Sequence, residues 1–218
     1  MRYSIVALAV LGLLTACGQP QQNNSEQNSQ TAVEQTAQSE TERLNQWFEE
    51  KYEEQLQQSP IQMTFLGRKD RYGDIDDMTV AAEKKQLEWL EGTVEELKAN
   101  FDYDKLNLEA QTSYDVWVYQ YEQAKRNAEF RGMDYVFDQM RGAHTFLPQF
   151  LINFHRVNSA EDMEAYISRI NGGATAIEQL LQRAKQQVEN GVRAPRFAYE
   201  QVIKEAKGLT SGDRKSVV

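Results

Sequence analysis

Cysteine, proline, glycine and histidine are all scarce in this sequence. A single cysteine among 218 residues allows no intrachain disulfide and no metal site built from several cysteines. Only four prolines and twelve glycines interrupt the chain, and no alternating apolar pattern is long enough for a strand. Gln, Glu, Ala and Leu are abundant instead, which favours helix over sheet. We therefore expect an all-α fold, an irregular array of about seven or eight helices.

Basic residues are fewer than acidic ones. Lys and Arg total 24 against 33 Asp and Glu, which gives a formal net charge of -9 and a pI of about 4.9. Nucleic acids carry phosphates that need a basic face, so we expect no nucleic-acid partner. The same charge argues against a basic patch for anionic lipids. Apolar residues make up 40% of the chain, which is enough for a sizeable core.

The only cysteine directly follows a short apolar run. Arg2 precedes this run over residues 4–14, which is too short to span a bilayer and is typical of a signal peptide. The run ends in the letters LTAC, which resemble the bacterial lipobox, where the chain is cleaved before a cysteine that carries diacylglycerol. A plain secretory signal with an incidental cysteine is the alternative. We expect residues 1–16 to be a lipoprotein signal peptide and Cys17 to be the lipidation site.

The segment after the cysteine indicates where the protein lies and where its folded part begins. Gly18 stands where Asp would favour retention in the inner membrane, so we expect a lipid anchor in the outer membrane, facing the periplasm. Residues 17–40 are rich in Gln, Asn and Ser and have almost no apolar side chains. Such a composition cannot bury a core and predicts a disordered tether. The folded part should start near Thr41.

From there to residue 212 the apolar spacing is helical almost throughout, and capping residues divide it into helices. The helix over residues 107–128 is rich in aromatic side chains, so we expect it to lie deep in the fold. The expected caps and breaks are Ser59-Pro60, Thr79, Asn107, Ser159, Asn171-Gly172-Gly173, Gly191 and Pro195.

The two histidines lie in the stretch HTFLPQFLINFH, at His144 and His155. On one unbroken helix they would share a face but stand about 16.5 Å apart, too far for one metal ion. Pro148 suits the first turn of a short helix and disfavours a helix through both. Zinc-binding helices usually pair histidines one turn apart with a Glu beside the first, and no His-Glu pair occurs here. We expect structural histidines and assign no catalytic or metal-ligating residue.

An acidic cluster and the remaining common motifs give no site either. Asp70, Asp74, Asp76 and Asp77 suggest calcium, but counting from Asp74 the fifth, sixth and twelfth positions are Met, Thr and Lys. An EF-hand needs an oxygen ligand, Gly and Glu there, so a solvated loop is the default. No Gly-x-Ser-x-Gly elbow, P-loop or Rossmann glycine pattern occurs.

Three segments, taken in their order and spacing, resemble the amino-terminal part of the bacterial DUF885 family, whose members are often envelope lipoproteins. They read SPIQMTFLGRKDRYGDIDDMT at 59–79, LPQFLINFHRVNSAEDMEAYISRINGG at 147–173 and ENGVRAPRFAYEQVI at 189–203. The middle segment is the most specific of the three. The resemblance covers most of this chain but only about the first third of a typical member.

The resemblance implies a relation to helical zinc metallopeptidases. Their zinc motif, a His-Glu pair followed closely by another His, lies in a later part of family members that this chain does not reach. We therefore expect no cofactor in this chain, but zinc and a peptide substrate in full-length relatives. Residues 208–212 still resemble the family, whereas 213–218 do not. We expect 41–212 to be an amino-terminal helical portion and 213–218 an aberrant tail, from a truncated gene, a frameshift or a fragment.

Two functions from different classes remain open. In the first, the chain is the amino-terminal portion of a lipid-anchored, metallopeptidase-like protein, where it walls one side of a substrate cleft and lacks hydrolytic activity by itself. In the second, it is a stand-alone, non-enzymatic envelope module for binding or scaffolding. Both share a membrane partner, reached through the lipid on Cys17.

Overall fold

The computed structural model describes residues 25–140 and 142–211, and these residues form helices and loops without any strand. This confirms the expected all-α class. Seven α-helices and one short 3-10 helix follow one another along the described chain. Their bounds are α1 Ser25–Leu56, α2 Pro60–Phe65, α3 Val80–Asn100, η1 Tyr103–Lys105, α4 Leu108–Glu129, α5 Ala143–Phe154, α6 Ala160–Glu189 and α7 Arg196–Leu209.

Most of the predicted caps are confirmed. Thr79, Asn107 and Ser159 each accept a hydrogen bond from the backbone N–H three residues further on, at the starts of α3, α4 and α6. Gly191 follows the end of α6 with a φ of 86°, the left-handed conformation that favours glycine. Pro195 caps the start of α7. Local side-chain chemistry therefore sets these helix ends.

Two helices differ from the sequence prediction at an end or at a proline. α1 begins at Ser25, inside the segment expected to be a tether, because its Gln, Glu and Ala residues are favourable helix formers. Pro148 lies inside α5 rather than in its first turn. The missing N–H of Pro148 removes one helical hydrogen bond, and the rest of this helix continues around it.

α6 runs unbroken through residues 171–173, where the sequence predicted a break. The glycines serve close packing instead. A Cβ atom added at Gly172 would lie 3.2 Å from Cγ1 of Ile75, and one at Gly73 would lie 3.4 Å from Ser168. The loop between α2 and α3 therefore packs directly against the backbone of α6.

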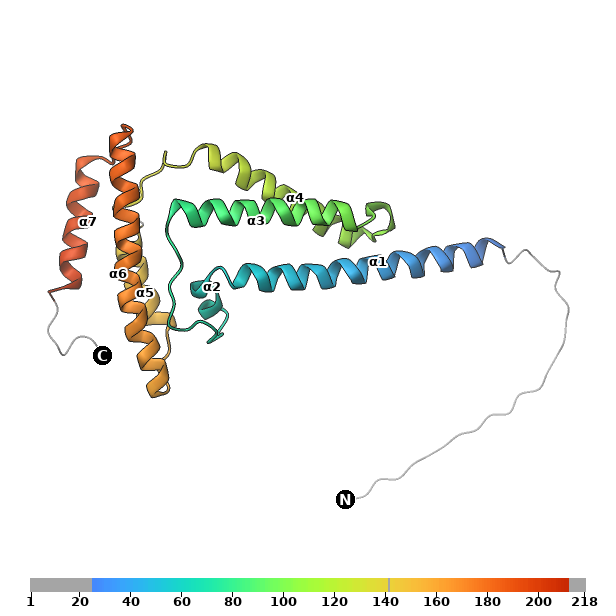
Figure 1. Cartoon of the computed structure of the whole chain (residues 1–218), viewed down its shortest axis with the longest axis horizontal. Coiled ribbons are helices and arrows are strands. Elements are labelled where there is room, and N and C mark those ends of the chain that lie inside the picture. Colours follow the sequence, from blue (N-terminus) through green and yellow to red (C-terminus); the bar gives the residue numbers. More distant parts are fainter. Residues whose placement is uncertain (1–24, 141, 212–218) are drawn as a thin grey trace, which may run out of the picture.

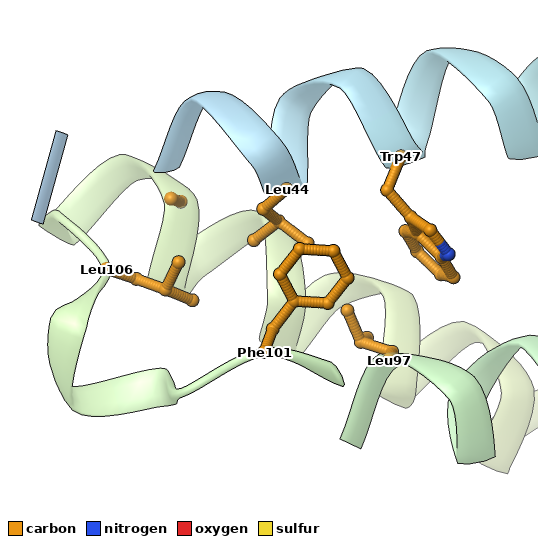
Figure 2. Close-up of a cluster of buried hydrophobic side chains, with 6 residues drawn as sticks. Leu44, Trp47, Leu97, Phe101 and Leu106 are labelled. Atoms are coloured by element: carbon orange, nitrogen blue, oxygen red, sulfur yellow. The ribbon is translucent and has the colours of Figure 1, made fainter. Parts of the chain in front are cut away.

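The helices form two groups, with α1, α3 and α4 on one side and α5, α6 and α7 on the other, and α2 near their junction (Figure 1). The first group encloses a set of buried apolar side chains that we call the aromatic cluster, in which Trp47 lies edge-on to Phe101 (Figure 2). Contrary to expectation, α4 is not deep, because Ala110 is its only buried residue. The aromatic cluster comprises Leu44, Trp47, Leu97, Phe101, Leu106 and Ala110.

The second group has its own apolar core between α2, α5 and α6. Phe150 is its most buried member, with 1% of its surface exposed. Ile75 and Met78, from the loop before α3, pack against it from outside. This core comprises Ile61, Leu147, Phe150, Leu151 and Ala176.

Candidate functional site

The two histidines lie at opposite ends of α5, as the residue just inside its start and the residue that caps its end. His144 and His155 are both buried, yet they have different neighbours and no contact with each other among the described interactions. Each histidine therefore lies in an environment of its own, and the two do not form one site.

His155 has hydrogen bonds on both ring nitrogens. Nε2–H donates to the carbonyl of Asp162 at 3.0 Å, and Nδ1 accepts from Nη1 of Arg169 at 3.0 Å. Because the guanidinium can only donate, this geometry assigns the neutral tautomer with its proton on Nε2. Burial lowers the pKa of His155, which favours the same neutral form.

Arg169 is the centre of the network, and its side chain is fully buried. Its Nε donates to the carbonyl of Asp74 at 2.9 Å. Its Nη2 donates to Oγ1 of Thr64 at 2.7 Å and to the carbonyl of Pro60 at 3.2 Å. One guanidinium thus joins α6 to α2, to the following loop and, through His155, to the end of α5.

The charge of Arg169 has no carboxylate partner among the described ion pairs. Aromatic faces lie beside it instead, with the guanidinium carbon 4.9 Å from the ring centroid of Tyr72 and 5.1 Å from that of Phe150. The Tyr72 ring also stacks on His155, at a centroid distance of 4.0 Å. Carbonyl dipoles and π-faces therefore stabilise the buried charge.

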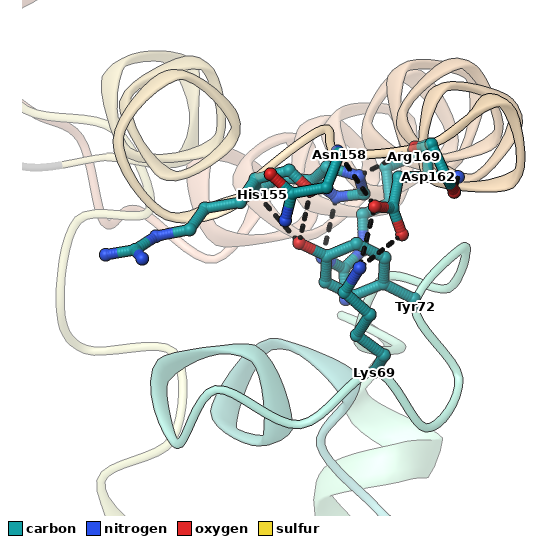
Figure 3. A network of polar contacts seen from close by, with 8 residues as sticks. Lys69, Tyr72, His155, Asn158, Asp162 and Arg169 are labelled. Atoms are coloured by element: carbon teal, nitrogen blue, oxygen red, sulfur yellow. Dashed lines mark hydrogen bonds and ion pairs between the residues drawn. The ribbon is translucent and has the colours of Figure 1, made fainter.

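Asp162 is buried and links the network to the half-exposed Lys69 (Figure 3). Both carboxylate oxygens accept from Nζ of Lys69 at 2.7 Å, and Oδ2 also accepts from the backbone N–H of Asn158 at 2.9 Å. The Lys69 ammonium, and then this backbone donor, lower the pKa of Asp162. We call Lys69, Tyr72, His155, Asp162 and Arg169 the arginine network. Lys69, Asp162, His155 and Arg169 are bonded in series, and the Tyr72 hydroxyl bonds the backbone of Arg156, so the network positions elements of the fold.

His144 has a carboxylate partner at one nitrogen only. Its Nε2 lies 2.8 Å from Oε2 of Glu205, which attaches α7 to the start of α5. Gln201, and then His144, lower the pKa of Glu205. The Nδ1 atom of His144 is buried without a hydrogen-bond partner among the described residues. A Cβ added at Gly142 would lie only 2.5 Å from it, so the glycine is required there.

The four aspartates of the loop after α2 are used separately. Asp70 pairs with Arg68 and Asp74 with Arg71. Asp76 accepts from the hydroxyl of Ser59 at 2.6 Å and from the N–H of Ile61 at 2.9 Å, which fixes the start of α2. Asp77 accepts from the N–H of Thr79. Across residues 25–140 and 142–211, no group of three or more His, Cys, Asp or Glu side chains is placed to hold a metal ion.

A cleft of about 480 Å³ lies where α1, α3, α4, the turn after α4 and α6 meet, and we call it the Glu83 cleft. Glu83 of α3 binds two guanidinium groups there, Arg183 of α6 at 2.7 Å and Arg131 of the turn at 3.0 Å. With Asp134, the lining holds two acidic and two basic residues, so it has no net formal charge. The apolar lining residues are Leu87, Trp89, Leu90, Ala124, Ala128 and Phe130.

Three amide side chains complete the lining of the Glu83 cleft. Gln55, Gln86 and Asn127 are exposed, and their side chains make no hydrogen bond within the described part of the chain. Amides both donate and accept, as a peptide backbone does. The cleft therefore offers apolar contact and solvent-exposed amides, and it carries no net formal charge. The lining contains no Ser, Cys or His nucleophile.

Neither arrangement was visible in the sequence. In the sequence, Arg169 is an ordinary charged helix residue of a type that is usually exposed. Two of its acceptors are carbonyls far away along the chain. The residues lining the Glu83 cleft come from five separate elements and share no motif. The predicted lipidation site, Cys17, lies outside the described residues. No helix that the structure describes is long and apolar enough to cross a membrane.

Comparison with known proteins gives one match. A family described as a bacterial protein of unknown function (DUF885) matches residues 60–217. No curated protein and no solved structure matches the chain. The matched region includes the arginine network and most of the lining of the Glu83 cleft.

Proposed function

Because this chain belongs to the DUF885 family, we propose that it is a lipid-anchored envelope protein that binds peptide in support of zinc metallopeptidase-like hydrolysis, without hydrolysing peptide itself. Its described helices would form one wall of a substrate cleft. Lipidation at Cys17 would place this wall at the outer membrane, facing the periplasm. The resemblance to envelope metallopeptidases supports the class of reaction.

The observation that carries the proposal is the Glu83 cleft. It presents uncommitted amides beside apolar side chains, and an extended peptide needs both, amides for its backbone and apolar contact for its side chains. Its formal charges balance, and Glu83 pairs with both arginines, so a neutral peptide suits it better than an ionic ligand. The ion pairs of Glu83 fix the relative position of α3, α6 and the turn that line it.

The two histidines, which are the side chains most suited to acid–base catalysis, make contacts outside the Glu83 cleft. His155 accepts a hydrogen bond from Arg169, and His144 is hydrogen-bonded to the carboxylate of Glu205. Neither histidine lines the Glu83 cleft. These contacts support a binding role for the described helices, with hydrolysis proposed to take place at the zinc site that the family resemblance implies.

Binding is tested on the full chain with neutral extended peptides, followed by tryptophan fluorescence, since Trp89 lines the cleft. We expect Ala128→Phe, which fills the cleft, to abolish saturable binding. Ala206→Phe is the matched control, because Ala206 is exposed on α7, away from the cleft. Equal binding by both variants would contradict the proposal.

Two further measurements test the remaining parts. Hydrolysis of peptides by the purified chain, dependent on zinc and stopped by EDTA, would overturn the non-catalytic role. Incorporation of labelled palmitate should be lost in Cys17→Ala, and continued labelling of that variant would contradict the lipid anchor.

A stand-alone binding module is the second candidate. The Glu83 cleft favours it, since five elements of this chain contribute side chains to the lining. Peptide affinity that is unchanged when a zinc-containing family member is added would support the stand-alone module. Faster peptide cleavage by that member in the presence of the chain would support the first proposal.

A further inference from the structure

α6 has a buried inner face and, beside it, a row of apolar side chains that is mostly exposed. Arg169, Ala176 and Leu180 are buried on the inner face. A second row lies at spacings of four and three residues along the helix, which is the repeat of a coiled-coil seam. We call this row the α6 seam, and it comprises Met163, Ile167, Ile170, Ala174, Ile177 and Leu181.

The α6 seam is exposed along most of its length, and its one half-buried member, Ile177, also packs against the apolar core of the second group. Met163, Ile167, Ile170 and Leu181 have 47%, 53%, 50% and 44% of their surfaces accessible. An amphipathic helix on a protein surface normally turns polar side chains to solvent. A regular apolar row in that position is the usual mark of a helix–helix contact with another chain.

We propose that the α6 seam pairs with the same seam of a second copy of this chain, with the two helices antiparallel. The occupant is identified by the charges beside the seam. Glu164 and Lys185 flank its two ends on the same side, and neither has an ion-pair or hydrogen-bond partner within the described part of the chain. In an antiparallel pair with two-fold symmetry, each of them lies opposite the other residue of the partner copy.

The register that pairs these charges also pairs the apolar side chains. When Glu164 faces Lys185 of the other copy, Ile170 faces Leu181 and Ala174 faces Ile177, in the layers of an antiparallel coiled coil. Shifting one copy by a heptad would place Glu164 against Glu178, and that repulsion disfavours the shifted register. Charge and packing therefore select the same pairing.

Glu164 and Lys185 cannot meet within one copy. Twenty-one residues separate them along one straight helix, a distance of about 31 Å. A zero-length carbodiimide cross-link between Glu164 and Lys185 can therefore form only between two copies. This gives a direct test on the full chain, reconstituted in vesicles of zwitterionic lipid.

The test uses two charge reversals, Glu164→Lys and Lys185→Glu, and finds the cross-linked peptides by mass spectrometry. The unchanged chain should give a cross-linked dimer joined from 164 to 185. Neither variant alone should give it, because each has like charges at both positions. A mixture of the two variants should restore it, because each copy then supplies the charge that the other needs. A mixture that stays monomeric would overturn the proposal.

Ile170→Glu tests the apolar part of the α6 seam. We expect the fraction of cross-linked dimer to fall about tenfold. The matched control is Ile152→Glu on α5, at a residue that is more exposed, at 73%, and lies off the seam. Circular dichroism of both variants checks that the helices persist. Equal loss in both variants, or dimers joined through other residues, would show that α6 does not pair copies.

Discussion

Both groups of helices have an apolar core, but among the residues that the structure describes only the second also contains buried charged side chains. In the first, the aromatic cluster brings α1, α3, η1 and α4 together mainly through apolar contact, with part-buried hydrogen bonds beside it, such as that from Trp47 to Glu96. In the second, the arginine network ties α2, its following loop, α5 and α6 through hydrogen bonds to one buried guanidinium. The apolar contact is non-directional, whereas each bond of the guanidinium needs one atom in one place.

This difference predicts how each region responds to substitution. Apolar packing tolerates a change of shape if volume is conserved, because no group loses an obligatory partner. A buried polar network does not, because removing one member leaves the others desolvated and unpaired. The following four substitutions or conditions probe this contrast.

Arg169→Met should have the largest effect. It keeps much of the apolar volume but leaves the carbonyls of Pro60 and Asp74 and the ring nitrogen of His155 without their donor. We expect a loss of about 3–5 kcal/mol in the free energy of unfolding, measured by urea denaturation. Arg169→Lys should also cost at least about 2 kcal/mol, because an ammonium cannot donate in the planar pattern of a guanidinium. If Arg169→Lys unfolds with the same free energy as the unchanged chain, the expected contrast between the two regions is wrong.

Leu97 probes the aromatic cluster in the same way, since it too is fully buried. Leu97→Ala opens a cavity and should cost about 2–5 kcal/mol. Leu97→Met conserves volume and should cost less than about 1.5 kcal/mol. Urea denaturation of this pair, compared with the Arg169 pair, measures the difference in tolerance. A methionine variant as unstable as the alanine variant would show that this core is no more tolerant than the network.

Gly172→Ala tests the close approach of the loop to α6. Alanine within a helix is favoured over glycine by about 0.8–1 kcal/mol, but at Gly172 the added Cβ presses on Ile75. Gly92→Ala in α3 is the matched control, because nothing lies within 4 Å of its added Cβ. We expect thermal unfolding to show the full gain only for Gly92→Ala. An equal gain at both sites would mean that the loop is not tightly packed there.

Acid should weaken the arginine network by the smallest amount. Burial lowers the pKa of His155 in the folded chain, so below the unfolded value of about 6.5 the unfolded chain binds a proton that the folded chain does not. Stability therefore falls as the pH drops from 7 to 5. The pKa of the nearby Asp162 carboxyl is lowered, so it stays ionised over this range, and the Arg169 guanidinium stays protonated. His155→Asn can still accept from Arg169 without titrating, so its urea midpoint should change less with pH; an unchanged slope would exclude His155 as the cause.

The sequence predicts the structural features that depend on residues close together along the chain. The caps at Thr79, Asn107 and Ser159 were predictable because each side chain bonds a backbone N–H three residues away. The all-α class followed from composition and apolar spacing. The helical start at Ser25 was missed because a segment poor in apolar residues can still consist of good helix formers.

What the sequence could not predict depends on distant segments. The glycines at 172–173 predicted a helix break. At Gly172 the structure instead favours glycine because Ile75 packs closely against it, and Ile75 belongs to a loop almost a hundred residues earlier. The aromatic side chains of α4 suggested depth, yet Tyr119 is 58% exposed. The Glu83 cleft was invisible for the same reason, as its lining gathers five elements.

The bonds of Arg169 also bear on the order in which the chain folds. Its acceptors on Asp74, Thr64 and Pro60 lie 95, 105 and 109 residues away along the sequence. Contacts that close such long loops cost the most chain entropy and tend to form after the local ones. The guanidinium can reach its partners only after α2, its loop and α6 have come together. The arginine network therefore forms late in folding. Its loss should raise the unfolding rate more than it lowers the folding rate.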